Sequence, residues 1–195
     1  MTEQPDAFYA IYQPEKTGLE KSRISGSLIV RPAHAGHIDA LAAITCERHG
    51  GDEDEHRSRI TKEILQNPGW IGRLLLVAEA DNVVVGFGRV VQYHPAPDSP
   101  PNVAPAGWYL GGVIVRSSFR RRGAATELTR RRLEWIAERA DEAFYTVDAQ
   151  NQVSISLHAR FHFVQVTRDF YHPGVSFTGE GGILFRAALK SSDDP

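Results

Sequence analysis

The sequence predicts an α/β fold with a mixed β-sheet, and three observations support this fold class. Short apolar runs typical of strands alternate with segments in which apolar residues recur every three or four positions, as in helices. The pair Asp81-Asn82 joins two of the apolar runs as a hairpin, which requires antiparallel strands. A long helical segment later separates two apolar runs, which is typical of a β-α-β crossover between parallel strands. We therefore expect the element order β-α-α-β-β-β-α-β-α-β-β.

The first half of the chain is expected to hold one strand, two helices and the hairpin. Pro32 ends the first strand because proline has no N–H to donate to a neighbouring strand. Gly50-Gly51 ends the first helix, and the second helix carries Ile60 and Ile64 on one face. These five elements are expected at residues 27–31, 37–47, 60–65, 73–80 and 83–93.

The second half is expected to hold the crossover. Five prolines between residues 95 and 105 indicate a loop. The Gly111-Gly112 pair lies within the strand that follows this loop and predicts a bulge or a close backbone approach there. Leu133, Ile136 and Ala140 share one face of the most regular helix. The six elements are expected at residues 108–115, 123–141, 143–148, 152–161, 163–170 and 182–189.

Composition limits the classes of function. The chain has 195 residues, a net charge of −2 and one cysteine, Cys46. The charge argues against a general nucleic-acid or anionic-membrane binder, and one cysteine excludes an intramolecular disulfide and a cysteine-based zinc cluster. No apolar stretch is long enough to span a bilayer, and no signal peptide is visible. We expect a cytoplasmic protein with an N-terminal extension (1–27), one domain (28–190) and a short tail (191–195).

The charge is unevenly placed, because seven arginines lie between Arg116 and Arg132. A turn of small residues at a helix N-terminus directs backbone N–H groups into one concavity, and the helix dipole adds partial positive charge. Such a turn follows three arginines at Gly123-Ala124-Ala125-Thr126, which predicts a pyrophosphate site. The alternative is that the arginines only begin a solvated helix, and Arg130 to Arg132 are expected to face solvent.

Two other nucleotide-binding motifs are excluded. No Gly-Lys-Ser/Thr P-loop occurs in the chain. Gly86-Phe87-Gly88 is only a fragment of a dinucleotide fingerprint, and strand glycines at a bulge explain it more simply.

Two segments resemble motifs of the GNAT N-acetyltransferase superfamily. Arg120, Gly123 and Ala125 match its acyl-CoA signature, Arg/Gln-x-x-Gly-x-Gly/Ala. After the next strand the family carries Asn-x-x-Ala-x-x-Leu-Tyr-x-Lys-x-Gly-Phe. At the same spacing this chain has Asn151, Ser154, Leu157, His158, Arg160, His162 and Phe163. The order of elements over residues 27–189 also resembles that of the family.

The resemblance implies acetyl-CoA as co-substrate and no metal. The strands 108–115 and 143–148 would part to admit pantetheine, and the turn would hold the pyrophosphate. Asn151 would either contact the pantetheine arm or stabilise the crossover. The residues implied in cofactor binding are Val113, Ile114, Val115, Arg120, Arg121, Arg122, Gly123, Ala124, Ala125, Thr126 and Asn151.

His158 stands where many family members have the tyrosine that protonates the leaving thiolate. Because imidazolium can donate a proton, His158 is the candidate general acid. The alternative is that His158 caps or packs on the crossover helix. His162 replaces the family's glycine, which leaves the backbone geometry there open. These two histidines have no third ligand near them in sequence, so we expect no metal site.

The sequence does not single out a general base. Relatives that place a base on the fourth strand have it where this chain has Tyr109, which is a weak base because its pKa is ordinarily about 10. Glu79 is a second weak candidate, acting through water.

The acceptor side is expected to be acidic. Asp52, Glu53, Asp54 and Glu55 lie between the first two helices, which border the acceptor site in this family, and would attract a cationic amine. A solvated helix start explains the four acids equally well. Tyr171 and Glu180, before the last strand, would shape the same pocket.

The sequence therefore predicts an acetyl-CoA-dependent N-acetyltransferase that acts on the primary amine of a small cationic molecule by direct attack in a ternary complex. The alternatives are a protein or peptide N-acetyltransferase and a non-catalytic acyl-CoA-binding sensor. We expect no nucleic-acid or membrane partner, and the resemblance implies that a homodimer is a common assembly.

Overall fold

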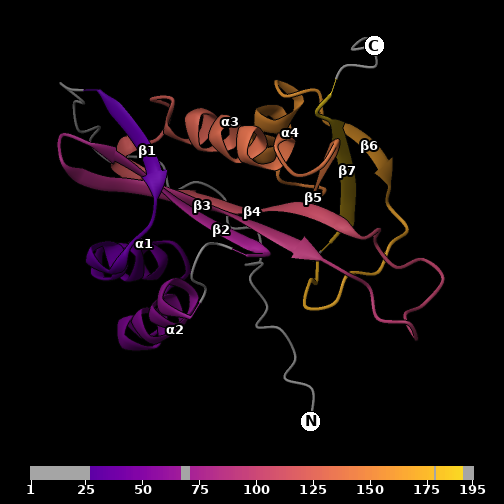
Figure 1. Cartoon of the computed structure of the whole chain (residues 1–195), viewed down its shortest axis with the longest axis horizontal. Coiled ribbons are helices and arrows are strands. Elements are labelled where there is room, and N and C mark those ends of the chain that lie inside the picture. The colour runs from indigo at the N-terminus through magenta and orange to yellow at the C-terminus, as the bar shows by residue number, and fades with distance from the viewer. Residues whose placement is uncertain (1–26, 67–70, 178, 191–195) are drawn as a thin grey trace. The chain divides into compact units, whose positions relative to one another are not determined.

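The computed structural model describes residues 27–66, 71–177 and 179–190. The expected extension (1–27) and tail (191–195) lie outside the described residues, apart from residue 27. The elements follow the predicted order (Figure 1). They are β1 (Leu28–Pro32), η1 (Ala35–His37), α1 (Ile38–His49), α2 (Glu53–Leu65), β2 (Arg73–Ala80), β3 (Val83–Tyr93), β4 (Gly107–Val115), η3 (Ser117–Phe119), α3 (Ala124–Ala137), β5 (Glu142–Asp148), α4 (Gln152–Ala159), β6 (Val164–Thr167) and β7 (Gly182–Ala188).

The described strands form one mixed sheet in the order β1-β2-β3-β4-β5-β7-β6. Antiparallel pairing joins β1 to β2, β5 to β7 and β7 to β6, whereas β4 and β5 are parallel. Asp81 and Asn82 have φ of 51° and 61°, the left-handed conformation that a two-residue hairpin turn requires. The predicted fold class and the predicted crossover are both confirmed.

Four elements end earlier than predicted, α4 and β7 by only one or two residues, and α2 begins at Glu53, inside the run that was expected to be a loop. The two larger differences, at α3 and β6, have local reasons. In the last turn of α3 the N–H of Arg139 donates to the Ile136 carbonyl, three residues back, so the helix tightens and stops at Ala137. β6 stops at Thr167 because the N–H of Asp169 donates to the Thr167 hydroxyl, which turns the chain away from the sheet.

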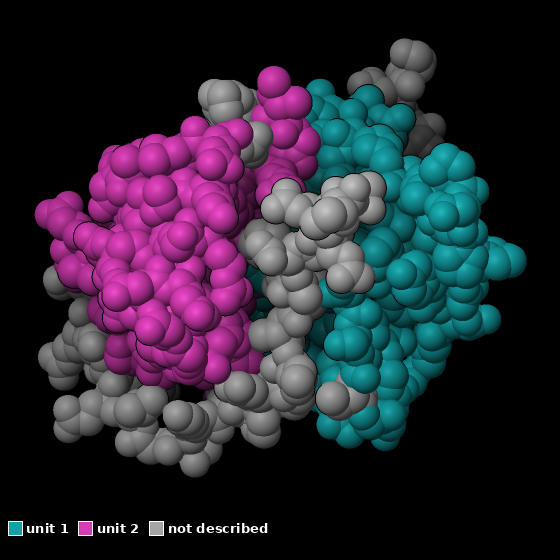
Figure 2. Space-filling view, turned by 90° about the horizontal axis from the view of Figure 1, so that it is seen from below, with its two compact units in different colours: residues 1–14, 91–112, 133–195 teal, residues 15–90, 113–132 magenta. Residues whose placement is uncertain are grey.

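The described residues group into two compact units, which Figure 2 colours separately. Unit 2 contains residues 27–90 and 113–132, and unit 1 contains residues 91–112 and 133–190, in both cases only where the structure describes them. Each unit is described by itself.

In unit 2, α1 and α2 cover one face of β2 and β3 (Figure 1). Leu41, Ile44, Ile60, Val77 and Phe87 belong to the apolar core between them. Burial of such side chains is the main stabilising contribution to this unit.

The glycines on either side of Phe87 allow close packing. A Cβ at Gly86 would lie 2.7 Å from the Ile114 carbonyl oxygen, and a Cβ at Gly88 would lie 3.1 Å from Nε of Arg132. Close approach therefore explains both glycines, whereas the sequence predicted a bulge there.

The expectation that Arg132 faces solvent is wrong. Arg132 is fully buried and donates to the carbonyls of Leu128 and Arg89 and to the Thr129 hydroxyl, each at 3.1 Å. Leu128 and Ile136, four residues away on either side, are also fully buried. Arg132 therefore lies on the inner stripe of α3, and its hydrogen bonds offset the cost of burying a polar group.

In unit 1, the aromatic residues of β5 and β7 form a cluster on each face of the strands. Phe144 stacks on Tyr109, in a core that includes Leu184. Tyr145 stacks on Phe185, with ring centroids 4.9 Å apart. Neighbouring residues thus serve opposite faces, as the alternation of a strand requires.

Within the described ranges, no helix is both long enough and apolar enough to cross a membrane.

Candidate active site

The predicted phosphate turn is a sharp bend that leads into α3 in unit 2. After β4, the N–H of Arg116 donates to the Val85 carbonyl at 2.8 Å, and η3 follows. Arg121 and Gly123 then adopt positive φ values of 59° and 87°. Two left-handed residues so close together turn the chain abruptly, so that α3 begins at the buried Ala124.

Gly123 leaves its backbone uncovered. It is exposed, and a Cβ at this position would meet no atom within 4 Å. Arg121 shows that this turn accepts a side chain at positive φ, so the conformation alone does not demand glycine. An open depression here is lined by Leu28, Gly123, Thr126 and Glu127. Because the first N–H groups of a helix have no acceptor within the helix, the depression suits an anion.

Glu127 puts a carboxylate at the same depression. Arg130 and Arg131 both bind it, and the hydrogen bond from Arg130 is the main reason that the pKa of Glu127 lies below its ordinary value. The carboxylate is therefore ionised at neutral pH, with two guanidinium groups against it. This arrangement weakens its repulsion of a bound phosphate.

The strand residues Val113, Ile114 and Val115 complete the unit 2 part of the predicted cofactor site. Val115 is buried, and the other two are half-buried. The parallel register between β4 and β5 places Tyr109 opposite Phe144, and both residues belong to unit 1.

Asn151 and His158 belong to unit 1, where both lie at α4. The Asn151 side-chain oxygen accepts from the N–H of Ser154 at 3.1 Å and so caps the N-terminus of α4. This contact supports the second of the two predicted roles, stabilisation of the crossover.

His158 is buried among aromatic rings. Its ring stacks on Tyr145 at 4.0 Å and meets the edge of Phe163, and Nδ1 lies 2.8 Å from the Ser154 carbonyl. A proton on Nδ1 therefore donates to that carbonyl. The hydroxyl of Tyr145 is buried, and burial raises its pKa far above the ordinary value. His158 is thus oriented by its own helix and packed against β5.

His162, at the family's glycine position, keeps the backbone conformation that favours glycine. Its φ is 60°, and its side chain is exposed. The question that the sequence left open is answered: the backbone turns as a glycine would, with a histidine side chain attached.

The two weak candidates for the general base are both engaged in the structure. The Tyr109 hydroxyl donates to the Pro105 carbonyl at 2.7 Å, and the residue is fully buried in unit 1. Glu79, in unit 2, binds Arg31 at 2.8 Å and His37 at 3.2 Å. The hydrogen bond from Arg31 is the main cause that lowers the pKa of Glu79, which makes it a weaker base still.

The acidic run begins α2. Asp52 is the N-cap and accepts from the N–H groups of Asp54 and Glu55 at 2.7 and 3.1 Å. Arg57 binds Glu53 and Asp54, and Arg59 lies 3.8 Å from Glu55. These contacts support the helix-start interpretation, and the two arginines bind three of the four carboxylates.

Tyr171 and Glu180 are exposed residues of unit 1. The backbone of Tyr171 pairs with the proline-rich loop, because Tyr171 donates to the Asn102 carbonyl and Ala104 donates to the Tyr171 carbonyl. The proline-rich loop is therefore tied to the segment that follows β6.

Glu47 was not among the residues that the sequence singled out. It is the last-turn residue of α1 whose carboxylate binds Ser117, at the beginning of the phosphate turn. Nothing local in the sequence marks it, since the two residues are 70 positions apart.

Comparison with known proteins gives the family. The model of the acetyltransferase (GNAT) family matches residues 38–163, well over half of the chain. The chain belongs to the GNAT acetyltransferase family. The match includes β4, the turn, α3 and α4, and it ends at the phenylalanine that closes the second motif. No curated protein matches the sequence.

Solved structures of GNAT proteins share the fold. The yncA protein of Salmonella typhimurium, whose structure contains its cofactor acetyl-CoA, is 16% identical with a TM-score of 0.60, and the match covers 87% of this chain and 98% of that one. For AAC(6′)-Iy, in complex with a bisubstrate analogue, CoA-S-monomethyl-acetylneamine, the identity is 22%, the TM-score 0.62 and the coverage 75% and 97%. A ribosomal-protein-alanine N-acetyltransferase from Brucella melitensis is 20% identical with a TM-score of 0.59, and the match covers 82% of this chain and 99% of that one.

Proposed function

We propose that this GNAT acetyltransferase binds acetyl-CoA with its pyrophosphate at the turn Arg120–Thr126 and transfers the acetyl group to the primary amine of a small cationic molecule. The uncovered backbone of Gly123, at the N-terminus of α3, is the observation that carries the cofactor part of the proposal. The acetyl-CoA in the yncA structure supports the same cofactor.

The choice of a small cationic acceptor rests on two weaker supports. The carboxylates of Asp54 and Glu55 are largely exposed, and the run 52–55 has four carboxylates but only two arginine partners among the described residues, so α2 keeps a negative end. The bisubstrate analogue in the AAC(6′)-Iy structure joins CoA to an acetylated neamine.

Direct attack requires a neutral amine beside the thioester. An alkylammonium with a pKa of about 10.4 is almost wholly protonated at neutral pH, so the rate should rise with pH as the amine loses its proton. A backbone N–H near Val113 is our candidate donor to the oxyanion that forms when the amine attacks the thioester.

His158 is our candidate for the acid that protonates the leaving thiolate. The hydrogen bond from Nδ1 to the Ser154 carbonyl fixes the ring, so Nε2 would carry the transferred proton. The stacking of the ring on Tyr145 and its hydrogen bond within α4 support packing as the competing role.

Thiol release from acetyl-CoA tests the proposal. The purified protein is mixed with acetyl-CoA and, separately, with di- and polyamines, an aminoglycoside, neutral primary amines and alanine-ended peptides. We expect fastest release with the small cations. Preference for peptides would replace the acceptor with a protein N-terminus. Acetyl-CoA binding without turnover on any of these amines would favour a sensor.

The compartment is part of the same proposal. Cys46 is a free cysteine, which suits a reducing environment such as the cytoplasm.

A further inference from the structure

Glu47 makes an unusual set of contacts for a residue at the end of a helix. Its carboxylate accepts from the hydroxyl of Ser117 at 2.7 Å and from the N–H of Ser117 at 3.1 Å, and Arg116 lies 3.4 Å away. All three residues belong to unit 2, so these contacts lie inside one compact unit.

Ser117 is the first residue of η3, and the side chain of its N-cap residue makes no capping bond. Glu47 therefore supplies from α1 an acceptor for the first N–H of η3, at a helix start whose own cap side chain makes no such bond. Beyond Ser117, the segment is held by its own bonds, from Phe119 to the Arg116 carbonyl and from Nε of Arg120 to the Val115 carbonyl. Gly123 follows three residues after Arg120.

The charge of Glu47 works against an anion at the turn. Burial alone would raise the pKa of this carboxyl, but the hydrogen bonds from Ser117 and the charges of Arg116 and Arg120 outweigh burial and hold the pKa below its ordinary value. The carboxylate is thus ionised at neutral pH, and it lies against the segment that leads to the phosphate turn. Any benefit to a bound phosphate has to come from shape, because the electrostatic effect is repulsive.

We propose that Glu47 is a positioning residue that holds the segment 116–123 in the shape that binds the cofactor pyrophosphate, and so ties α1 to the cofactor turn. The inference rests on the proposed cofactor site. Removal of Glu47 should therefore weaken CoA binding. If Glu47 acted by its negative charge alone, its removal would tighten CoA binding instead.

Calorimetric titration with CoA tests the inference on the full chain. Glu47→Ala should raise the dissociation constant for CoA about tenfold, because two charge-assisted hydrogen bonds to Ser117 are lost. Glu47→Gln keeps an acceptor of the same shape and removes the repulsive charge, so its dissociation constant should stay within about threefold of the wild-type value.

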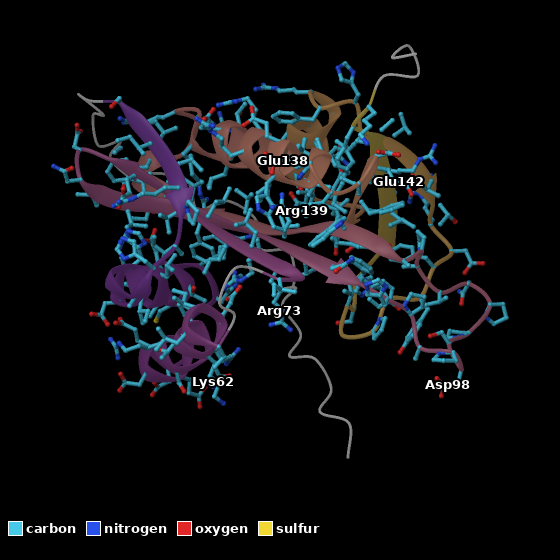
Figure 3. The ribbon with its side chains drawn as sticks, in the orientation of Figure 1. Lys62, Arg73, Asp98, Glu138, Arg139 and Glu142 are labelled. Carbon is cyan, nitrogen blue, oxygen red and sulfur yellow. The ribbon has the colours of Figure 1, made fainter. Side chains whose placement is uncertain are left out.

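A double-mutant cycle shows whether Glu47 acts through Ser117. Ser117→Ala should weaken CoA binding in the wild-type chain and have no further effect in Glu47→Ala. Glu138→Gln is the matched control: Glu138 is also an exposed glutamate paired with an arginine, at 2.9 Å from Arg139, and both lie just after α3 (Figure 3). This control should bind CoA as the wild type does.

Several outcomes overturn the inference. Glu47→Ala binding CoA as tightly as the wild type, or more tightly, contradicts positioning, and so do additive effects in the cycle. If Glu47→Ala does not fold, CoA binding by Ser117→Ala and Glu47→Gln is compared instead. Weaker CoA binding by Ser117→Ala alone supports positioning, and unchanged CoA binding by both variants refutes it. A wild-type chain that does not bind CoA defeats the proposed function instead.

Discussion

At the scale of single residues, His162 shows how a family glycine can be replaced while its conformation is kept. A side chain at φ of 60° costs about 1–2 kcal/mol relative to glycine. Since the His162 side chain is exposed, little packing is lost when it is removed. His162→Gly should therefore raise the free energy of unfolding by about 0.5–1 kcal/mol, after the greater entropy of glycine in the unfolded chain is subtracted. Urea unfolding measures the change.

The control for this prediction is His162→Ala, which removes the imidazole but keeps the strained backbone. The free energy of unfolding of His162→Ala should not exceed that of the wild type. A less stable His162→Gly would mean that the imidazole itself stabilises the turn.

The role of His158 is also a question about one residue. His158→Phe keeps an aromatic ring against Tyr145 but has no proton to give. If His158 is the acid, kcat should fall about 100-fold while the KM for acetyl-CoA stays nearly constant. Steady-state kinetics from pH 6 to 9 provide the measurement. An unchanged kcat in His158→Phe would assign His158 to packing alone.

At the scale of elements, α1 carries a pH-sensitive group in its last turn. Burial first, and then the positive charges of Arg48, His56 and Arg89, lower the pKa of His49 from 6.5 to about 4. Between these two values the unfolded chain binds the proton more readily than the folded chain does. The stabilising contribution of neutral His49 is therefore complete above pH 6.5 and is lost as the pH falls toward 4.

His49→Gln removes this proton uptake. Between pH 7 and pH 4.5, the variant should lose less unfolding free energy than the wild type, as chemical denaturation at several pH values will show. If the two stability curves run parallel, burial of His49 does not lower its pKa.

The observed helices and strands also show which features of the fold can be predicted from the sequence. Hydrophobic period and turn chemistry are local, so they predict the order of the strands and helices and the hairpin at Asp81-Asn82 correctly, but not the beginning of α2 at Glu53 or the ends of α3 and β6. The inner stripe of α3 was misread at Arg132, because a charged residue gives no apolar signal. Gly88, 44 positions earlier, leaves room beside the guanidinium group of Arg132, because a Cβ there would lie 3.1 Å from Nε of this arginine.

At the scale of the whole molecule, the seven clustered arginines differ in the contacts that they make. Arg116 contacts Glu47, Arg130 and Arg131 bind Glu127, and Arg132 is buried. The three that remain, residues 120–122, stand immediately before Gly123. The sequence located this turn because its motif is contiguous, whereas the bond from Ser117 to Glu47 joins distant segments and has no local signature.

Binding of acetyl-CoA to two Gly123 variants tests whether this turn holds the cofactor pyrophosphate. Gly123→Glu adds bulk and negative charge where the pyrophosphate is expected. Both Gly123→Glu and Gly123→Ala place a side chain at a positive φ, but Gly123→Ala adds only a methyl group and no charge. By calorimetric titration, we predict binding to the wild type, weakened binding to Gly123→Ala, and none to a folded Gly123→Glu. Wild-type affinity in Gly123→Glu would contradict the assignment of this turn to the cofactor.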